Sequence, residues 1–222
     1  MDSIRDISID LPSGGALPGL LLQPSSAHTL YVMAHGAGAG MRHPFLTSLA
    51  GLLAGEGIGT LRFQFPYTDA GRRRPDPPAV LQHAVCAAVR TAASVAPALR
   101  LVAGGKSLGG RMTSSAAAHE ALPVAGLIFL GFPLHAPGTP GTSRAEHLAL
   151  VDRPMLFLQG TRDALARLDL IREVCGGLGE RATLHAVEGG DHSFHVLKRS
   201  GRTDADVLEE LARAISRWVE RL

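Results

Sequence analysis

The chain has 222 residues, of which 45% are hydrophobic and 19% are charged, and its formal net charge at pH 7 is +2. This composition is typical of a globular protein with a sizeable core, and the length fits one α/β domain, which we predict to span residues 1–222. Basic residues are scattered apart from the cluster Arg72 to Arg74, which argues against a nucleic-acid partner. The sequence has no apolar stretch of about 20 residues and does not open on a basic segment followed by an apolar one, so neither a membrane partner nor a secretory leader is expected. We therefore expect a cytoplasmic protein, and its many Ala, Gly and Arg residues suggest a bacterial origin.

The first predicted elements are two strands, Ile4 to Asp10 and Leu17 to Gln23, joined by the turn Pro-Ser-Gly-Gly at residues 12–15. Such a turn between two strand-like segments is typical of an antiparallel hairpin. Several near-continuous apolar runs follow, as expected of parallel strands that are covered on both faces. These runs occupy residues 29–34, 100–103, 126–130 and 155–158.

Segments with a helical repeat separate these strands. One begins behind Pro44 and places Phe45, Leu49, Leu52 and Leu53 on a shared face. A second has its apolar face at Leu81, Val85, Ala88, Val89 and Ala92. The alternation of strands and helices predicts an α/β fold with a mostly parallel, doubly wound sheet, in which functional sites form at the carboxyl ends of the strands.

The last segment, residues 203–222, has the most regular helical repeat. Thr203 and Asp206 have the spacing of a capping box, and an apolar stripe runs from Val207 to Leu222. Trp218 belongs to this stripe, so we expect it to pack in the core.

The remaining features are two long loops and two cysteines. The loops are predicted over residues 66–78 and 133–143, both rich in proline. Cys86 and Cys175 lie in helix-like apolar segments, so we expect buried free thiols rather than a disulfide framework.

The segment GGKSLGGR, from Gly104 to Arg111, allows two interpretations. A phosphate-binding P-loop requires a glycine five residues before the glycine of Gly-Lys-Ser, but Arg100 occupies that position, ahead of the apolar run that the loop should follow. The nearby segment HGAGAG, residues 35–40, fails the dinucleotide-binding spacing because Met41 stands where the last glycine should be. We therefore predict no nucleotide cofactor, and no other cofactor is indicated.

The second interpretation is a nucleophile elbow, the sharp turn between a strand and a helix that presents a catalytic serine. The pattern Gly-x-Ser-x-Gly is met by Gly105, Ser107 and Gly109, directly after the apolar run that ends at Ala103. Taken alone, this pattern is also compatible with a glycine-rich connection that carries a solvated serine.

Two further residues complete the elbow interpretation, because each follows a later predicted strand in the order serine, acid, histidine. Asp163 follows the strand at 155–158, and His192 follows a strand predicted over 182–187. A serine hydroxyl needs a histidine to accept its proton, and that histidine needs a carboxylate to orient it. We therefore predict Ser107 as nucleophile, His192 as general base and Asp163 as its orienting acid.

The developing oxyanion of such a reaction needs two hydrogen-bond donors. The serine turn supplies the backbone N–H of Leu108. The second donor is expected after the strand that ends at Ala34, where the N–H of Ala37 is the first choice and that of Gly38 the alternative.

Other titratable residues compete for roles in the site. His43, His135 and His195 are candidates for lining the site, and His195, expected one turn into a short helix, is the rival base. Asp191 is expected to fix the loop before the base, and Asp169 is a remote alternative acid within a helical pattern. The histidines have no metal-ligand spacing, so no metal site is predicted.

This set of motifs resembles the α/β-hydrolase superfamily, and within it the small dienelactone hydrolase-like proteins. The resemblance spans almost the whole chain, from His35-Gly36 to the Gly190-Asp-His192-Ser-Phe194 segment. Dienelactone hydrolases proper are similar in fold but have a cysteine as nucleophile. Because Ser107 occupies that position here, the resemblance does not extend to their substrate.

The resemblance also bears on substrate size. Many members carry a helical lid after the strand equivalent to 126–130, but only twenty residues separate Phe132 from Arg153, so no lid domain is expected. The predicted activity is hydrolysis of a small ester or thioester through an acyl-enzyme. The alternative is a non-catalytic scaffold or binding protein with the same fold. For Lys106, Arg111 and the Arg72 to Arg74 cluster, solvation, ion pairing and attraction of an anionic substrate all stay open.

Overall fold

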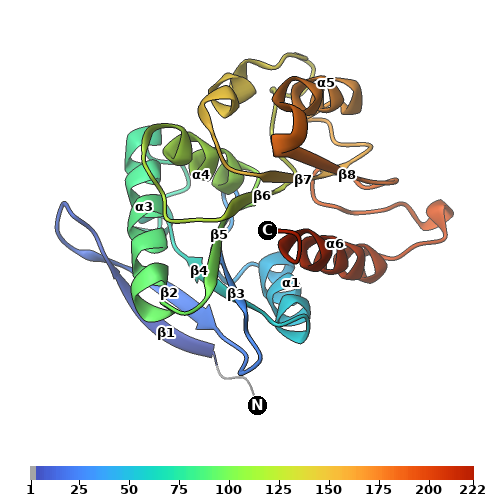
Figure 1. Ribbon diagram of the computed structural model, residues 1–222. Helices are drawn as coiled ribbons and strands as arrows, with labels where there is room; N and C mark the ends of the chain where they lie inside the picture. The colour runs from blue at the N-terminus through green and yellow to red at the C-terminus, as the bar shows by residue number, and fades with distance from the viewer. Residues whose placement is uncertain (1–3) are drawn as a thin grey trace.

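The computed structural model describes residues 4–222, so the predicted domain span begins three residues outside the described range. The strands form one eight-stranded sheet with the order β1-β2-β4-β3-β5-β6-β7-β8 (Figure 1). Pairing is antiparallel between β1 and β2 and between β2 and β4, and parallel across the rest of the sheet. This confirms the predicted mostly parallel sheet with an N-terminal antiparallel hairpin. The strands are β1 (Ile4–Asp10), β2 (Ala16–Leu22), β3 (Thr29–Ala34), β4 (Ile58–Phe63), β5 (Arg100–Lys106), β6 (Gly126–Leu130), β7 (Met155–Gly160) and β8 (Ala182–Val187).

Helices cover both faces of the sheet, which is the doubly wound arrangement that the sequence predicts. One face packs against α1 and α6, and the other against α3, α4 and α5 (Figure 1). The α-helices are α1 (Pro44–Gly55), α2 (Pro66–Asp69), α3 (Pro78–Val95), α4 (Leu108–His119), α5 (Leu168–Leu178) and α6 (Asp204–Val219). Short 3₁₀-helices are η1 (Ser143–Leu150), η2 (Gly179–Arg181) and η3 (Lys198–Ser200).

Local sequence signals explain where the two helices of the first face begin. Pro44 occupies the first turn of α1, where its missing N–H costs no hydrogen bond. At α6 the Thr203 side chain accepts from Asp206 N–H and the Asp206 carboxylate accepts from Thr203 N–H, which is the predicted capping box. Trp218 is buried, as predicted, and lies so close to Gly126 that a Cβ there would come within 2.6 Å of the indole ring.

Two details of the helices differ from the sequence predictions. The buried side chains of α1 are Leu46, Leu49, Ala50 and Leu53, whereas Phe45 and Leu52 are only partly buried. The predicted loop over 66–78 contains the single-turn helix α2, which Pro66 initiates.

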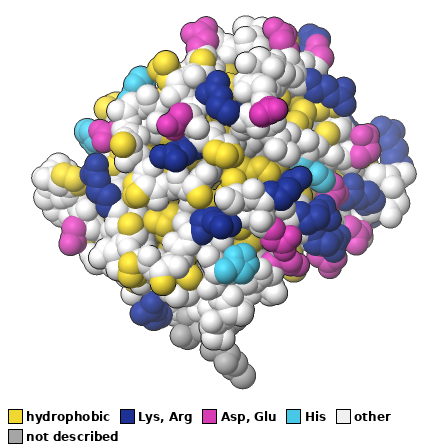
Figure 2. All heavy atoms as spheres, in the orientation of Figure 1, with side chains coloured by type: hydrophobic (Ala, Val, Ile, Leu, Met, Phe, Trp, Pro, Cys, Tyr) yellow, Lys and Arg dark blue, Asp and Glu magenta, His cyan; other side chains and the backbone are white. Residues whose placement is uncertain are grey.

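The connections between β6, β7 and β8 leave the carboxyl end of the sheet open. Within residues 4–222, the segment that joins β6 to β7 carries only η1, so no lid is inserted there, as predicted. None of the helices in this described range is both long and apolar enough to cross a membrane. On the face shown in Figure 2, basic and acidic side chains are interspersed.

Candidate active site

Ser107 lies at the turn between β5 and α4, at the carboxyl end of a central strand. Its backbone has φ 50° and ψ −114°, and Phe194 is the one other non-glycine residue between 4 and 222 with positive φ. A non-glycine residue in this conformation is strained, so the surrounding structure has to hold it in place. Ser107 N–H donates to the Leu130 carbonyl on β6, and the Ser107 carbonyl accepts from Arg111 N–H in the first turn of α4. A strand, a sharp turn with Ser107 at its apex and a helix are the geometry that the nucleophile-elbow prediction requires, and the role of Ser107 as nucleophile stays a prediction.

The glycines two residues before and after Ser107 are required by a close backbone approach. A Cβ on Gly105 would come within 2.1 Å of the Ala34 carbonyl oxygen, and one on Gly109 within 2.5 Å of the same atom. The turn thus sits directly against the end of β3. This contact also brings Ser107 next to the segment that follows Ala34.

Substitution of Gly105 with alanine is expected to lower the free energy of unfolding by about 3 kcal/mol or more, because the new methyl group overlaps a backbone atom that cannot move without breaking the sheet. Gly176→Ala is the matched control, since a Cβ at this α5 position meets nothing within 4 Å. This control should raise stability by about 0.5 kcal/mol through helix propensity. Urea unfolding of both variants measures the difference. Equal stability of Gly105→Ala and the unsubstituted protein would contradict the proposed close contact.

The three predicted catalytic side chains meet in one hydrogen-bonded chain. His192 Nε2 lies 2.8 Å from Ser107 Oγ, and His192 Nδ1 lies 2.7 Å from Asp163 Oδ2. Because an ionised carboxylate only accepts hydrogen bonds, Nδ1 carries the proton and the Nε2 lone pair faces the serine hydroxyl. His192 follows β8 and Asp163 follows β7, so parallel strands bring together residues that lie far apart in the sequence.

Asp163 is held by more than His192. Its side chain is completely buried, Oδ2 also accepts from Gln159 Nε2 (2.5 Å), and Oδ1 accepts from Leu165 N–H (2.7 Å). Gln159 Oε1 in turn accepts from Phe132 N–H at 2.9 Å. These partners compensate the burial of a charge and fix which oxygen faces His192. Sequence reasoning missed Gln159; its signal was a polar residue at the end of the otherwise apolar strand β7.

The two predicted oxyanion donors belong to residues close to Ser107: Leu108 follows it in the sequence, and Ala37 lines the same pocket. Among the described residues, neither Leu108 N–H nor Ala37 N–H has a hydrogen-bond partner within the protein, whereas Gly38 N–H points to the Tyr67 hydroxyl at 3.4 Å. This favours Ala37 over the Gly38 alternative. The role itself stays a proposal.

His35 holds the turn that carries Ala37. Its Nε2 accepts from Phe65 N–H (3.1 Å), so the proton sits on Nδ1, which donates to the Gly36 carbonyl (2.8 Å). Burial lowers the pKa of His35, and the ring is therefore neutral in this arrangement. We had not predicted a structural role for His35 from the sequence.

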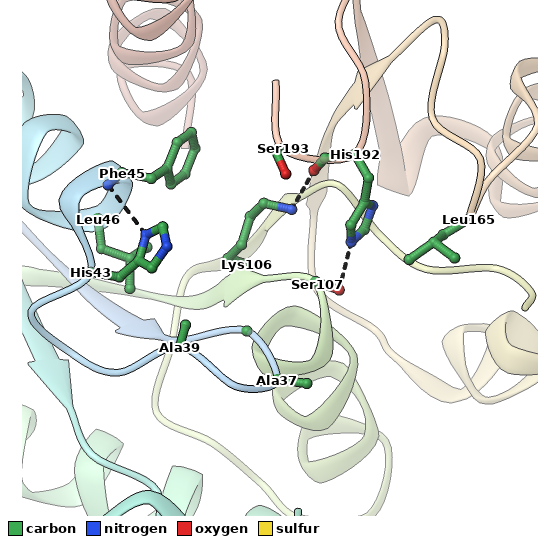
Figure 3. Close-up of a pocket in the computed structure, with 11 residues that line it drawn as sticks. Ala37, Ala39, His43, Phe45, Leu46, Lys106, Ser107, Leu165, His192 and Ser193 are labelled. Atoms are coloured by element: carbon green, nitrogen blue, oxygen red, sulfur yellow. Dashed lines mark hydrogen bonds between the residues drawn. The ribbon is translucent and has the colours of Figure 1, made fainter. Parts of the chain in front are cut away.

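A pocket of about 320 Å³ opens beside Ser107 (Figure 3). Its walls include the apolar side chains of Phe45, Leu46 and Leu165, together with His43 and Lys106. Nothing in this lining is acidic. The predicted lining role of His43 thus agrees with its position at the N-terminus of α1, where its Nδ1 accepts from Phe45 N–H.

Lys106, which the sequence left unassigned, reaches from β5 toward the segment that carries His192 (Figure 3). Its ammonium nitrogen donates to the His192 carbonyl (2.5 Å) and lies 5.5 Å from the centre of the Phe194 ring. Burial lowers the pKa of Lys106 to about 8, against the attraction of Asp163 and Asp191.

The rival residues lie in other environments. His195 is exposed in a segment without regular secondary structure rather than in the short helix that we predicted, because Asp204 binds its ring at 2.9 Å and Asp191 Oδ1 accepts its backbone N–H. Asp191 therefore fixes this loop, as predicted. Asp169 lies on α5 and pairs with Arg167 on the surface. It does not contact His192, so its position does not support the role of alternative acid.

The remaining predicted site residues fall outside the Ser107 pocket. His135 is bound instead to Ala136 and Arg167 backbone groups. Arg111 and the Arg72 to Arg74 cluster do not line this pocket either. Arg72 forms an ion pair with Asp76 within its own loop (2.7 Å).

Residues 4–222 contain no cluster of three or more His, Cys, Asp or Glu side chains placed to hold a metal ion. Cys86 and Cys175 are buried free thiols, as predicted, and burial raises the pKa of each. Neither thiol lines the Ser107 pocket.

Comparisons with known proteins place this geometry in a wider context. The family described as alpha/beta hydrolase domain matches residues 27–220. Among solved structures, the chain is similar to a dienelactone hydrolase from Anabaena variabilis, with a TM-score of 0.78 and 20% identity over 99% of this chain and 98% of that one. It is also similar to a serine hydrolase without lid from Xanthomonas campestris, with a TM-score of 0.77 and 22% identity over 97% of this chain and 95% of that one. For the esterase domain of a Rhodothermus marinus protein the TM-score is 0.75 and the identity 15%, over 99% of this chain and 98% of that one. At these identities the three structures share the fold with this chain.

Proposed function

The chain belongs to the alpha/beta hydrolase domain family, and from this premise we propose that it is a serine hydrolase that cleaves a small ester or thioester through an acyl-enzyme. The observation that carries the proposal is the unbroken hydrogen-bonded chain from Ser107 through His192 to the buried Asp163, beside a pocket. The serine hydrolase and the esterase domain among the structures of this fold support the same reaction class.

In the proposed reaction each of these residues has a role that its position supports. Ser107 Oγ attacks the carbonyl carbon while His192 Nε2 takes its proton, and Asp163 stabilises the resulting imidazolium. The negative charge that develops on the carbonyl oxygen is stabilised by the N–H groups of Leu108 and Ala37. His192 then gives its proton to the leaving alcohol or thiol. Water, deprotonated by His192, releases the acyl group by the same steps and regenerates Ser107.

A non-catalytic scaffold has no use for this arrangement. The strained φ of Ser107 and the burial of the Asp163 carboxylate each cost folding free energy. Both costs are expected in an enzyme, where the strained backbone and the buried carboxylate preorganise the site for reaction.

The size of the pocket and the missing lid set an expected substrate preference. Short acyl groups fit about 320 Å³, whereas a long chain has no lid helices to cover it. We expect kcat/KM for 4-nitrophenyl acetate and butyrate to exceed that for 4-nitrophenyl palmitate. The Ser107→Ala variant supplies the background rate for each ester. A higher kcat/KM for the palmitate ester would contradict the proposed small-substrate specificity.

A further inference from the structure

Lys106 is attracted by the charges of Asp163 and Asp191, but it forms no direct ion pair with any described residue. Its ammonium bonds to a neutral carbonyl, that of His192, and faces the ring of Phe194. None of the ion pairs among residues 4–222 includes Lys106. Asp163 and Asp191 attract the ammonium without bonding to it, because their oxygens bind other groups: Asp163 accepts three hydrogen bonds, and Asp191 Oδ1 accepts two backbone N–H groups.

The position of this ammonium is fixed by close packing. Lys106 and Ser107 are neighbours in sequence, and both line the same pocket. A Cβ on Gly131, whose φ is +69°, would lie 3.1 Å from Lys106 Nζ and 3.5 Å from His192 Nδ1. Because Gly131 has no side chain, the Lys106 ammonium and the His192 ring can lie side by side at this position.

An ammonium without a direct ionic partner among the described residues has two physical consequences in this place. Its partial burial in a pocket with apolar walls of Phe45, Leu46 and Leu165 carries a desolvation cost that an anion would offset. It also opposes the positive charge that His192 acquires when it accepts the Ser107 proton, since like charges at this range repel. A negative group on the substrate, placed against Lys106, would remove both penalties during the reaction.

We propose that Lys106 selects substrates that carry a carboxylate a short chain away from the ester carbonyl, and that its ammonium binds this carboxylate inside the Ser107 pocket. The inference rests on the proposed hydrolase function and names its substrate class. A carboxylate matches the site better than a phosphate dianion, because one lysine supplies the only fixed positive charge in the lining.

Two pairs of esters with equal shape test the proposal and separate the two sides of the substrate. On the acyl side, ethyl hydrogen succinate is compared with ethyl 4-methylpentanoate, in which an isopropyl group replaces the carboxylate. On the alcohol side, 3-acetoxypropanoate is compared with 3-methylbutyl acetate. The measured quantity is the ratio of kcat/KM for the anionic ester to kcat/KM for its neutral partner. In at least one pair we expect this ratio to be roughly 10 to 100, which corresponds to the usual free energy of one hydrogen bond to a charged group.

Variants at the two lysines of the chain assign this preference. Lys106→Met is expected to bring the ratio down to about unity or below, and Lys106→Arg, which keeps the charge, to retain part of it. Lys198→Met is the matched control, because Lys198 is the other lysine and is exposed on η3. A ratio that Lys106→Met leaves unchanged, including equal losses on both esters, would overturn the proposal and leave Lys106 as an anchor for the His192 carbonyl.

The unsubstituted protein provides a second test that does not depend on the folding of a variant. The anionic preference should decline as pH rises through about 8, where Lys106 loses its proton. Other titratable groups also face this region: His43 at the N-terminus of α1, His192 and Asp191 in the segment before α6, and Asp163 after β7. Their effects on Ser107 chemistry are common to both esters of a pair. A constant ratio from pH 7 to pH 10 would contradict binding of the substrate carboxylate by Lys106.

Failure of this inference is distinguishable from failure of the proposed function. Turnover of the neutral esters depends on Ser107 and not on a bound carboxylate. If the neutral esters are hydrolysed and the ratio never exceeds unity, the carboxylate proposal is wrong and the hydrolase proposal stands. If Ser107-dependent turnover of all four esters is absent, the hydrolase proposal itself is overturned, and this inference with it.

Discussion

Replacement of Ser107 by alanine is expected to lower kcat for 4-nitrophenyl acetate on the order of a million-fold, as in enzymes of the same catalytic logic. The variant loses the atom that forms the acyl-enzyme, and His192 is left without a proton to accept. Residual catalysis of roughly a thousand-fold over water can persist, because Leu108 and Ala37 still donate to the oxyanion. The fold should be unaffected, since among the residues that the structure describes the Ser107 side chain bonds only to His192.

The control for this variant is Ser25→Ala, which removes an exposed hydroxyl from the connection between β2 and β3. It should have the kcat of the unsubstituted protein. Near-normal kcat in Ser107→Ala, with an intact fold by circular dichroism, would rule out Ser107 as the nucleophile.

The second large effect is expected at Asp163, where substitution by asparagine should lower kcat by about ten-thousand-fold with little change in size. The carboxylate accepts from His192 Nδ1, Gln159 Nε2 and Leu165 N–H at once. An amide presents its own N–H₂ group to one of these donors, so His192 either loses its orientation or takes the wrong tautomer.

Asp169→Asn is the matched control, because it is the same chemical change at the acid that the sequence left as an alternative. Asp169 is exposed and pairs with Arg167 on the surface, so the control should keep full kcat. Steady-state kinetics on both variants decides between the two acids. A large loss in Asp169→Asn, with Asp163→Asn active, would reverse the assignment.

The sequence predicted the features that follow from strand order and spacing. Asp163 and His192 each come directly after an apolar strand, and parallel strands bring such positions to one edge of the sheet. The Pro12 to Gly15 turn predicted the hairpin because its residues allow few other structures. These are local signals whose structural consequence is almost independent of the rest of the chain.

What the sequence did not predict depends on contacts between distant segments. The insertion of β4 between β2 and β3 is decided by pairing across the sheet, and nothing local to residues 58–63 specifies it. The place of Gln159 beneath Asp163 depends on how β7 faces the start of the next loop. His195 was expected in a helix from its spacing to His192, but the Asp191 and Asp204 carboxylates hold it in a segment without regular secondary structure.

Lys106 illustrates the same limit at a single side chain. In the sequence it stands beside Ser107 within a glycine-rich turn, where it also made a phosphate-binding interpretation possible. Its actual partner, the His192 carbonyl, lies 86 residues away, and Gly131 on a third segment leaves the room for it. A contact among three segments has no signature in any one of them.

Reaction with a fluorophosphonate probe tests the central claim, an activated serine at position 107, most directly. Such a probe phosphonylates a serine, with loss of fluoride, only when a general base activates the serine and donors stabilise the developing charge. We expect intact protein mass spectrometry to show one adduct, peptide mapping to place it on Ser107, and Ser107→Ala to show none. Folded, unsubstituted protein that takes up no probe, or takes it up at another residue, would contradict the assignment of a catalytic serine to this site.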